Sequence, residues 1–94
     1  MIIQRGQNVI VLPERADKYS VGITVFSEGT QERNPGGYWT HAFQVDGAEL
    51  PSIDFYGSPE RWALRPDRKT IVLYPSSDCE REVRVQYYPE ARVL

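Results

Sequence analysis

The chain of 94 residues has little of what builds disulfide frameworks, metal sites and membrane spans. It contains a single cysteine, Cys79, and a single histidine, His41. It therefore cannot form an internal disulfide, and it lacks the set of cysteines and histidines that a structural zinc site uses. Its longest apolar runs, such as residues 9–12, are far shorter than the roughly 20 residues needed to cross a bilayer. We expect no disulfide, no metal centre and no membrane partner.

An excess of charge of one sign is also missing. The 11 Lys and Arg residues nearly balance the 13 Asp and Glu residues, and the formal net charge is -2. This composition gives no bulk attraction to nucleic acid or to acidic membranes, so we expect no specific nucleic-acid partner. The first six residues lack the basic start and the apolar stretch of a secretory signal, which predicts a cytoplasmic origin.

Short segments of alternating apolar and polar residues dominate the chain, separated by Gly and Pro. A period of two is typical of β-strands, and no segment of helical length is present. The expected strands cover residues 7–12, 19–25, 38–45, 52–56, 61–64, 69–74 and 82–88. This pattern predicts an all-β fold, a small antiparallel β-sandwich or barrel of six to seven short strands, in a single domain over residues 1–94. We expect the last three strands to form an antiparallel meander.

Two segments outside the expected strands are candidates for contact arms. Residues 27–37 form a long loop with no large apolar side chain, and a loop of this length is typically functional or mobile. Residues 89–94 form a C-terminal tail that ends in Val93 and Leu94. We expect this tail to dock onto a neighbouring protein, and its alternative is to pack against its own domain.

Reactive groups are scarce, which disfavours catalysis. No nucleophile and orienting carboxylate lie at a sequence spacing from His41 that is typical of a catalytic set. A packed histidine, or one at a strand edge, is therefore the favoured interpretation. Cys79 lies among acidic neighbours, which oppose formation of the thiolate. The Gly36-Gly37 pair lacks the lysine and the helix of a phosphate-binding loop. We expect no enzyme and no cofactor, and an enzyme centred on His41 ranks last.

Aromatic and basic residues point instead to contact surfaces. The chain is 12% aromatic with little interior to hold the rings, and one of the neighbouring rings of Tyr87 and Tyr88 must point away from the core. Between positions 61 and 69 there are four basic residues and one acidic residue, a group that suits the acidic surface of a protein neighbour. Its alternatives are a solvated strand face and, with Trp62, a contact with the phosphates and bases of a nucleic acid. The predicted interface residues are Arg61, Trp62, Arg65, Arg68, Tyr87, Tyr88, Val93 and Leu94.

Two segments near the C-terminus form a characteristic pair. Residues 69–75 (KTIVLYP) are followed, after a short polar turn, by residues 82–89 (EVRVQYYP). With residues 61–68 included, this region resembles a hairpin of small structural proteins in tailed-bacteriophage virions, particularly neck and head–tail adaptor proteins. The resemblance implies a non-enzymatic protein that assembles in rings or on a capsid surface, as a decoration, neck or tail component of a virion built in the host cytoplasm.

Three hypotheses about function follow. The leading hypothesis is a structural protein that acts by self-association, as a homo-oligomer, and by contacts with other virion proteins. The second is a carbohydrate- or other ligand-binding β-sandwich module that uses Tyr38, Trp39 and Trp62 as flat stacking surfaces. The third is the enzyme centred on His41.

Overall fold

The computed structural model describes residues 1–51 and 53–91, and within them the chain forms nine strands and one short 3-10 helix. These elements are β1 (Ile2–Ile3), β2 (Val9–Val11), β3 (Gly22–Phe26), β4 (Trp39–Gln44), η1 (Gly47–Glu49), β5 (Tyr56–Gly57), β6 (Arg61–Leu64), β7 (Thr70–Tyr74), β8 (Ser76–Ser77) and β9 (Arg81–Gln86). The prediction of an all-β fold is confirmed.

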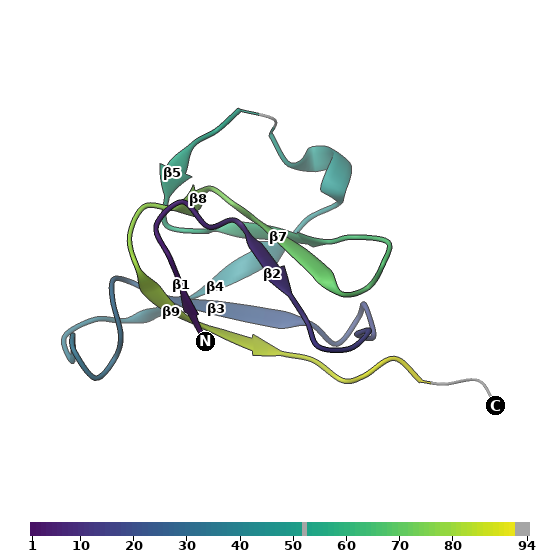
Figure 1. Cartoon of the computed structure of the whole chain (residues 1–94), viewed down its shortest axis with the longest axis horizontal. Coiled ribbons are helices and arrows are strands. Elements are labelled where there is room, and N and C mark those ends of the chain that lie inside the picture. Colours follow the sequence, from purple (N-terminus) through teal and green to yellow (C-terminus); the bar gives the residue numbers. More distant parts are fainter. Residues whose placement is uncertain (52, 92–94) are drawn as a thin grey trace.

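Seven of the strands form one sheet, in the order β1-β9-β3-β4-β6-β7-β2. The sheet curls into a half-barrel, and β5 and β8 form a separate two-stranded sheet beside it (Figure 1). The predicted arrangement was wholly antiparallel, and this part is wrong, because β4 pairs with β6 and β5 pairs with β8 in parallel. The parallel pair is possible because residues 45–60 make a long connection that brings the chain back to the same end of the sheet.

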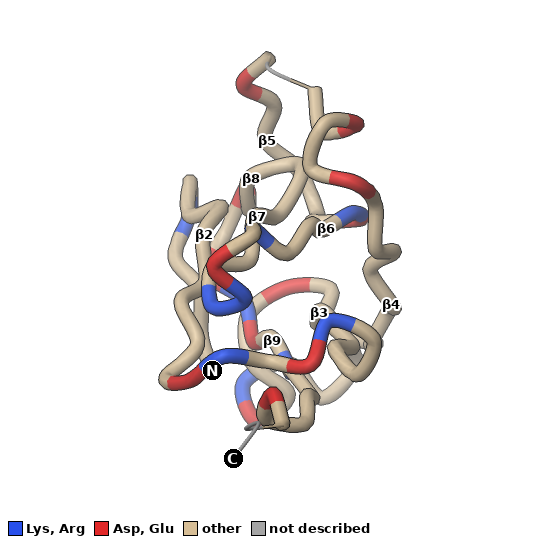
Figure 2. The backbone as a smooth tube through the Cα atoms, turned by 90° about the vertical axis from the view of Figure 1, so that its right-hand side faces the viewer, with Lys and Arg blue, Asp and Glu red and all other residues tan. Residues whose placement is uncertain are grey.

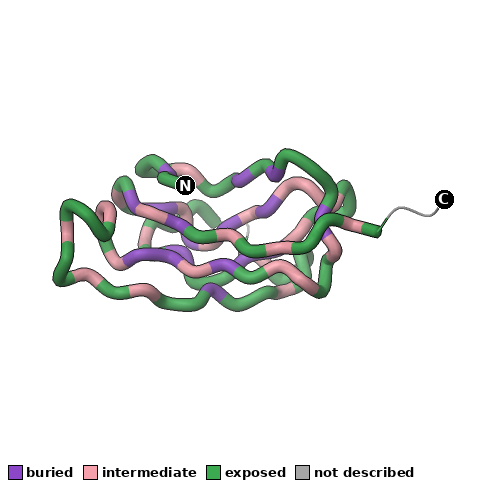
Figure 3. Tube along the Cα trace, turned by 90° about the horizontal axis from the view of Figure 1, so that it is seen from below, coloured by how far each residue is buried: buried purple, intermediate pink, exposed green. Residues whose placement is uncertain are grey.

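The core lies on the concave side of the sheet. The alternation in β7 buries Ile71 and Leu73, and the alternation in β3 buries Ile23 and Val25, as expected for strands with one covered face. Trp62 on β6 is only 2% exposed and fills the middle of this core. In the view from below, buried positions recur along the strands and are interrupted by intermediate and exposed ones (Figure 3). Burial of these side chains is the main source of the stability of the sheet.

The N-terminal segment closes the two ends of the half-barrel. β1 pairs with β9, whereas β2 pairs with β7 at the opposite end of the strand order. Further along, Ala16 forms an antiparallel bridge with Pro89, and the Glu90 N–H donates to the Arg15 carbonyl over 2.9 Å. The first part of the C-terminal tail is therefore fastened to its own domain, while Val93 and Leu94 lie outside the described residues.

Two sequence-based expectations about strands are wrong. The expected hairpin of residues 69–74 and 82–88 does not form, because β7 pairs with β6 and β2 while β9 pairs with β3 and β1. The antiparallel pairing of β6 with β7 is confirmed. The expected strand over residues 52–56 is absent among residues 53–55, where the chain is irregular up to the start of β5.

The loop of residues 27–37 connects β3 with β4 as expected, and it is fastened along one side. The Gly29 N–H donates to the Glu80 carbonyl over 2.9 Å, and the Glu82 N–H donates back to the Gly29 carbonyl over 2.8 Å. Gly29 adopts a positive φ of 66°, a conformation that glycine accepts without strain. These bonds fasten the loop at Gly29 to the start of β9.

Candidate interaction face

One side of β4 lacks a neighbouring strand over half of its length. On the β3 side, every residue from Trp39 to Ala42 has a partner. On the β6 side, only Phe43 and Gln44 are paired, and the Phe43 N–H donates to the Glu60 carbonyl over 2.8 Å. The first half of β4 therefore borders an open space instead of a strand.

A groove of about 500 Å³ occupies this space. Its lining residues come from the end of β3, from β4 and from the segment entering β6: Ser27, Tyr38, Thr40, His41, Phe43, Ser58, Pro59, Glu60 and Arg61. The rings of Tyr38 and Phe43 are 66% and 71% exposed. The groove thus combines two open aromatic rings with the charged side chains of Glu60 and Arg61.

A second hollow, of about 390 Å³, adjoins the groove because both are lined by Ser58 and Glu60. Phe55 and Tyr56 line this second hollow, and Phe55 also lines a third hollow together with Ile53. All three side chains are more than half exposed. We call the surface formed by Tyr38, Phe43, Ile53, Phe55 and Tyr56 the apolar face. Exposed apolar patches rimmed by polar groups are typical of interaction sites.

A buried arginine lies directly behind the groove. The Arg81 side chain is at the start of β9, and the residue is 1% exposed. Its Nε donates to Ser77 Oγ over 2.9 Å, and its Nη1 donates to the carbonyls of Phe26 and Ser27 over 3.1 and 3.0 Å. A buried guanidinium requires this kind of complete pairing, because an unpaired charge in the interior is strongly unfavourable.

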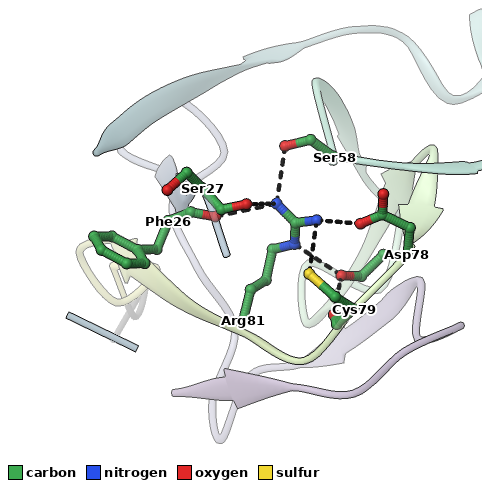
Figure 4. A network of polar contacts seen from close by, with 7 residues as sticks. Phe26, Ser27, Ser58, Asp78, Cys79 and Arg81 are labelled. Carbon is green, nitrogen blue, oxygen red and sulfur yellow. Dashed lines mark hydrogen bonds and ion pairs between the residues drawn. The ribbon is translucent and has the colours of Figure 1, made fainter. Parts of the chain in front are cut away.

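The remaining bonds of Arg81 reach three further groups (Figure 4). Nη1 also donates to Ser58 Oγ over 3.0 Å, and Nη2 donates to the Asp78 carboxylate and to Cys79 Sγ, the latter over 3.2 Å. We call Arg81 and these partners the arginine centre. It joins the end of β3, the segment before β6, and β8 with the turn that follows it.

The arginine centre also determines the shape of the groove. Ser27 and Ser58 line the groove and bind the Arg81 guanidinium from opposite segments. Ser27 Oγ in addition accepts a hydrogen bond from the Tyr38 N–H over 3.1 Å. Arg81 therefore holds the two walls of the groove at their spacing, although it does not line the groove itself.

Cys79 belongs to this centre and is half-buried. Burial raises the pKa of the Cys79 thiol, and this effect exceeds the lowering caused by the positive charge of Arg81. The thiol thus stays protonated at neutral pH and serves as a hydrogen-bond acceptor for Nη2.

The predicted basic patch is divided by the structure. Trp62 was expected at the surface, and this is wrong: its ring lies in the core, where Nε1 donates to the Ala42 carbonyl over 3.1 Å. The alternation of β6 places Trp62 and Arg61 on opposite faces of the sheet. Arg61 lines the groove, whereas Arg65 and Arg68 lie beyond the other end of β6.

The structure also places the aromatic residues that the sequence grouped together in different surroundings. Tyr87 packs partly against the core while Tyr88 is exposed, which confirms that one of the two neighbouring rings points away from the core. Tyr38 lines the groove, but Trp39 does not, because its ring packs edge-on against Phe26 with centroids 5.1 Å apart and lies under the Arg84 guanidinium. Of the three rings expected to stack on a sugar, Tyr38 alone lies open in the groove.

Sequence reasoning missed Arg81 as a structural residue. One signal pointed to it, since Arg81, Val83 and Val85 are spaced by two along β9 and share its inner face. It also did not select Phe43, Ile53, Phe55 and Tyr56, because these four residues fall within the expected strands 38–45 and 52–56, where alternation alone does not show which face is open.

Several further observations bear on function. Comparison of the chain with protein-family models, with curated proteins and with solved structures finds no match. Over residues 1–51 and 53–91, no three His, Cys, Asp or Glu side chains gather where they could hold a metal ion. In the same part of the chain, no helix has the length and apolar character to cross a bilayer. His41 lines the groove, and its side chain forms no hydrogen bond with the described residues.

Proposed function

We propose that the protein is a non-enzymatic structural protein that acts by self-association and by contacts with other proteins of an assembly. The observation that carries this proposal is the apolar face, where five large side chains are each at least 55% exposed beside a groove. Aromatic side chains in such positions give a large contact area at a low cost in side-chain entropy.

The open half of β4 supports the same proposal. Its residues Trp39 to His41 border the groove on the side where no strand is paired, whereas the Ala42 carbonyl accepts from Trp62 Nε1, so we propose that an added segment of another chain meets β4 at these three residues. Strand edges without neighbours are a common means of joining protein chains. A structural protein therefore has at this place both main-chain bonds and apolar side chains for a partner.

Membership of a phage virion stays a prediction that rests on the resemblance of residues 61–89. The two segments that carry this resemblance are not paired with each other in the sheet, so the fold adds no support to it. The proposal here is the broader one, an assembly protein, and the virion is one such assembly.

Light scattering on a sizing column, over a series of protein concentrations, tests the proposal. We expect the molar mass of the wild type to rise with concentration, and the double variant Phe43→Ser/Phe55→Ser to remain a monomer. Val11→Ser is the matched control, because Val11 is 65% exposed but lies on β2, outside the apolar face. A wild type that is monomeric at every concentration contradicts the proposal.

The carbohydrate-binding alternative keeps only part of its support. Trp62 is buried, and Trp39 is covered by Phe26 and Arg84. Retention of the wild type on a polysaccharide matrix, abolished by Tyr38→Ala, favours that alternative over the assembly protein.

A further inference from the structure

Acidic residues gather around the apolar face. Residues 34–60 contain four acidic residues and no Lys or Arg. Among the described residues, the carboxylates of Glu49, Asp54 and Glu60 form no ion pair and accept no side-chain hydrogen bond. In Figure 2 the acidic positions between β4 and β5 lie in the upper part of the view, above β6 and β7. Arg61 also lines the groove, and even with this cation the four acidic residues leave the region around the apolar face with an excess of negative charge.

The turn between β6 and β7 has the opposite character. Residues 65–69 contain Arg65, Arg68 and Lys69 with a single acid, Asp67. The Asp67 carboxylate is occupied within its own turn: it accepts from the Lys69 N–H over 2.9 Å and from Thr70 Oγ1 over 2.7 Å. None of the three cations forms an ion pair with a described residue. The Asp67 carboxylate stays ionised, so the turn has a net charge of +2.

Two exposed tyrosines accompany these cations. Tyr19 and Tyr88 are the two most exposed large hydrophobic side chains among the described residues. The Tyr88 N–H donates to Ser20 Oγ over 2.8 Å, and the Ala16 N–H donates to the Arg68 carbonyl over 2.9 Å, so both rings lie on segments fastened to the basic turn. We call Arg65, Arg68, Lys69, Tyr19 and Tyr88 the basic end.

The two charged surfaces lie on different sides of one molecule. In Figure 1 the acidic segment around β5 is at the top, and the turn between β6 and β7 projects to the right. We propose that the basic end of one copy docks onto the apolar face of the next copy, with Arg65, Arg68 and Lys69 opposite Glu49, Asp54 and Glu60. This inference rests on the proposed self-association and names the two surfaces that meet.

The chemistry of the two surfaces fits such a contact. The basic turn, with a net charge of +2, meets three carboxylates that form no ion pair with the described residues. Guanidinium groups also bind favourably over exposed rings such as those of Phe55 and Tyr56. Because the two surfaces differ, the contact is head-to-tail, and each copy keeps one surface free for a further copy. Repetition of such a contact gives a closed ring or a filament rather than a symmetric dimer.

Sedimentation velocity on two charge variants and on their mixture tests the proposal. The first variant, Arg65→Glu/Lys69→Glu, makes the basic turn acidic. The second, Glu49→Lys/Asp54→Lys, makes the apolar face basic. We expect each variant alone to be a monomer, because like charges then meet in the contact. An equal mixture should assemble again, because each reversed surface finds its complement on the other variant.

Salt supplies a second readout on the unaltered protein. Between about 0.1 M and about 1 M salt the Debye length falls from about 10 Å to about 3 Å, so association of the wild type should weaken at least tenfold. Far-ultraviolet circular dichroism of both variants verifies the fold, and restored assembly in the mixture itself excludes misfolding.

The outcomes separate this inference from the proposed function. If the wild type associates but the variants associate equally well, or the mixture fails to restore assembly, the head-to-tail contact is wrong and the proposed function stands. If the wild type is monomeric under all conditions, both are wrong.

Discussion

The arginine centre and the apolar face lie on either side of Ser27 and Ser58. Both depart from the usual distribution of side chains, because a charged side chain is buried at the first and apolar side chains are exposed at the second. At the arginine centre a charged group is 1% exposed and all its donors are paired within the chain. At the apolar face, Phe43 and Ile53 are more than 70% exposed and have little packing. The first arrangement stabilises the fold, and the second leaves contact energy for a partner.

The largest expected effect comes from removing the guanidinium. Arg81→Met leaves the carbonyls of Phe26 and Ser27 and the hydroxyl of Ser77 without their donor, and each buried unpaired group costs about 1–3 kcal/mol. We expect the free energy of unfolding in urea to fall by at least about 3 kcal/mol.

Arg84→Met is the matched control on the same strand. Arg84 is exposed and lies 4.0 Å over the Trp39 ring, a contact worth about 0.5–1 kcal/mol. Equal losses for the two variants would contradict the distinct role of Arg81.

A smaller effect is expected where the loop covers Phe26. A Cβ atom at Gly37 would overlap the Phe26 ring, so Gly37→Ala must displace that ring and its partner Trp39. Overpacking of this kind costs about 1–3 kcal/mol. Thermal unfolding and tryptophan fluorescence should both change, whereas Gly36→Ala, with open space around its Cβ, should leave both unaltered.

The Asp67 carboxylate, in the exposed turn between β6 and β7, makes the stability of the fold depend on pH. Hydrogen bonds from Thr70 and from the Lys69 N–H lower the pKa of Asp67 from 3.8 to about 2. Because the folded-state pKa is lowered, this group stabilises the fold above about pH 4, and the contribution is lost as the pH falls to about 2. Urea midpoints over this range should therefore decline less steeply in Asp67→Asn than in the wild type. An identical decline would contradict the prediction.

The smallest effect on unfolding is expected at the apolar face. Phe43→Ser/Phe55→Ser removes two mostly exposed rings and the contact of Phe55 with the Tyr74 ring, 6.4 Å between centroids, so the free energy of unfolding of the dilute monomer should fall by no more than about 1 kcal/mol. A loss comparable to that of Arg81→Met would mean that these rings stabilise the fold instead of a contact.

Local patterns in the sequence predicted most strands but not their partners. Alternation identified β3, β4, β6, β7 and β9, because the period of two depends only on which side chains are buried. The pairing of β1 with β9 joins residues nearly 80 positions apart, and nothing local indicates it. Because β7 and β9 are close in the chain, the sequence suggested that they pair as a hairpin. Instead, the N-terminal segment supplies a separate partner strand to each of them: β2 pairs with β7, and β1 pairs with β9.

The site could be predicted only in part, for a related reason. Tyr38 and Arg61 were selected and do line the groove, but Trp62 was placed with Arg61 although alternation assigns them to opposite faces. The partners of Arg81 come from segments up to 55 residues apart. Its inward position follows from its spacing to Val83, yet its bonding requires the three-dimensional fold.

Hydrogen exchange of backbone amides at low and at high protein concentration is the most direct test of the apolar face as a contact surface. The account predicts slower exchange at high concentration in residues 38–43 and 53–60, and no change around Arg81, whose amides are protected in the monomer already. Identical exchange of those two segments at both concentrations would contradict it.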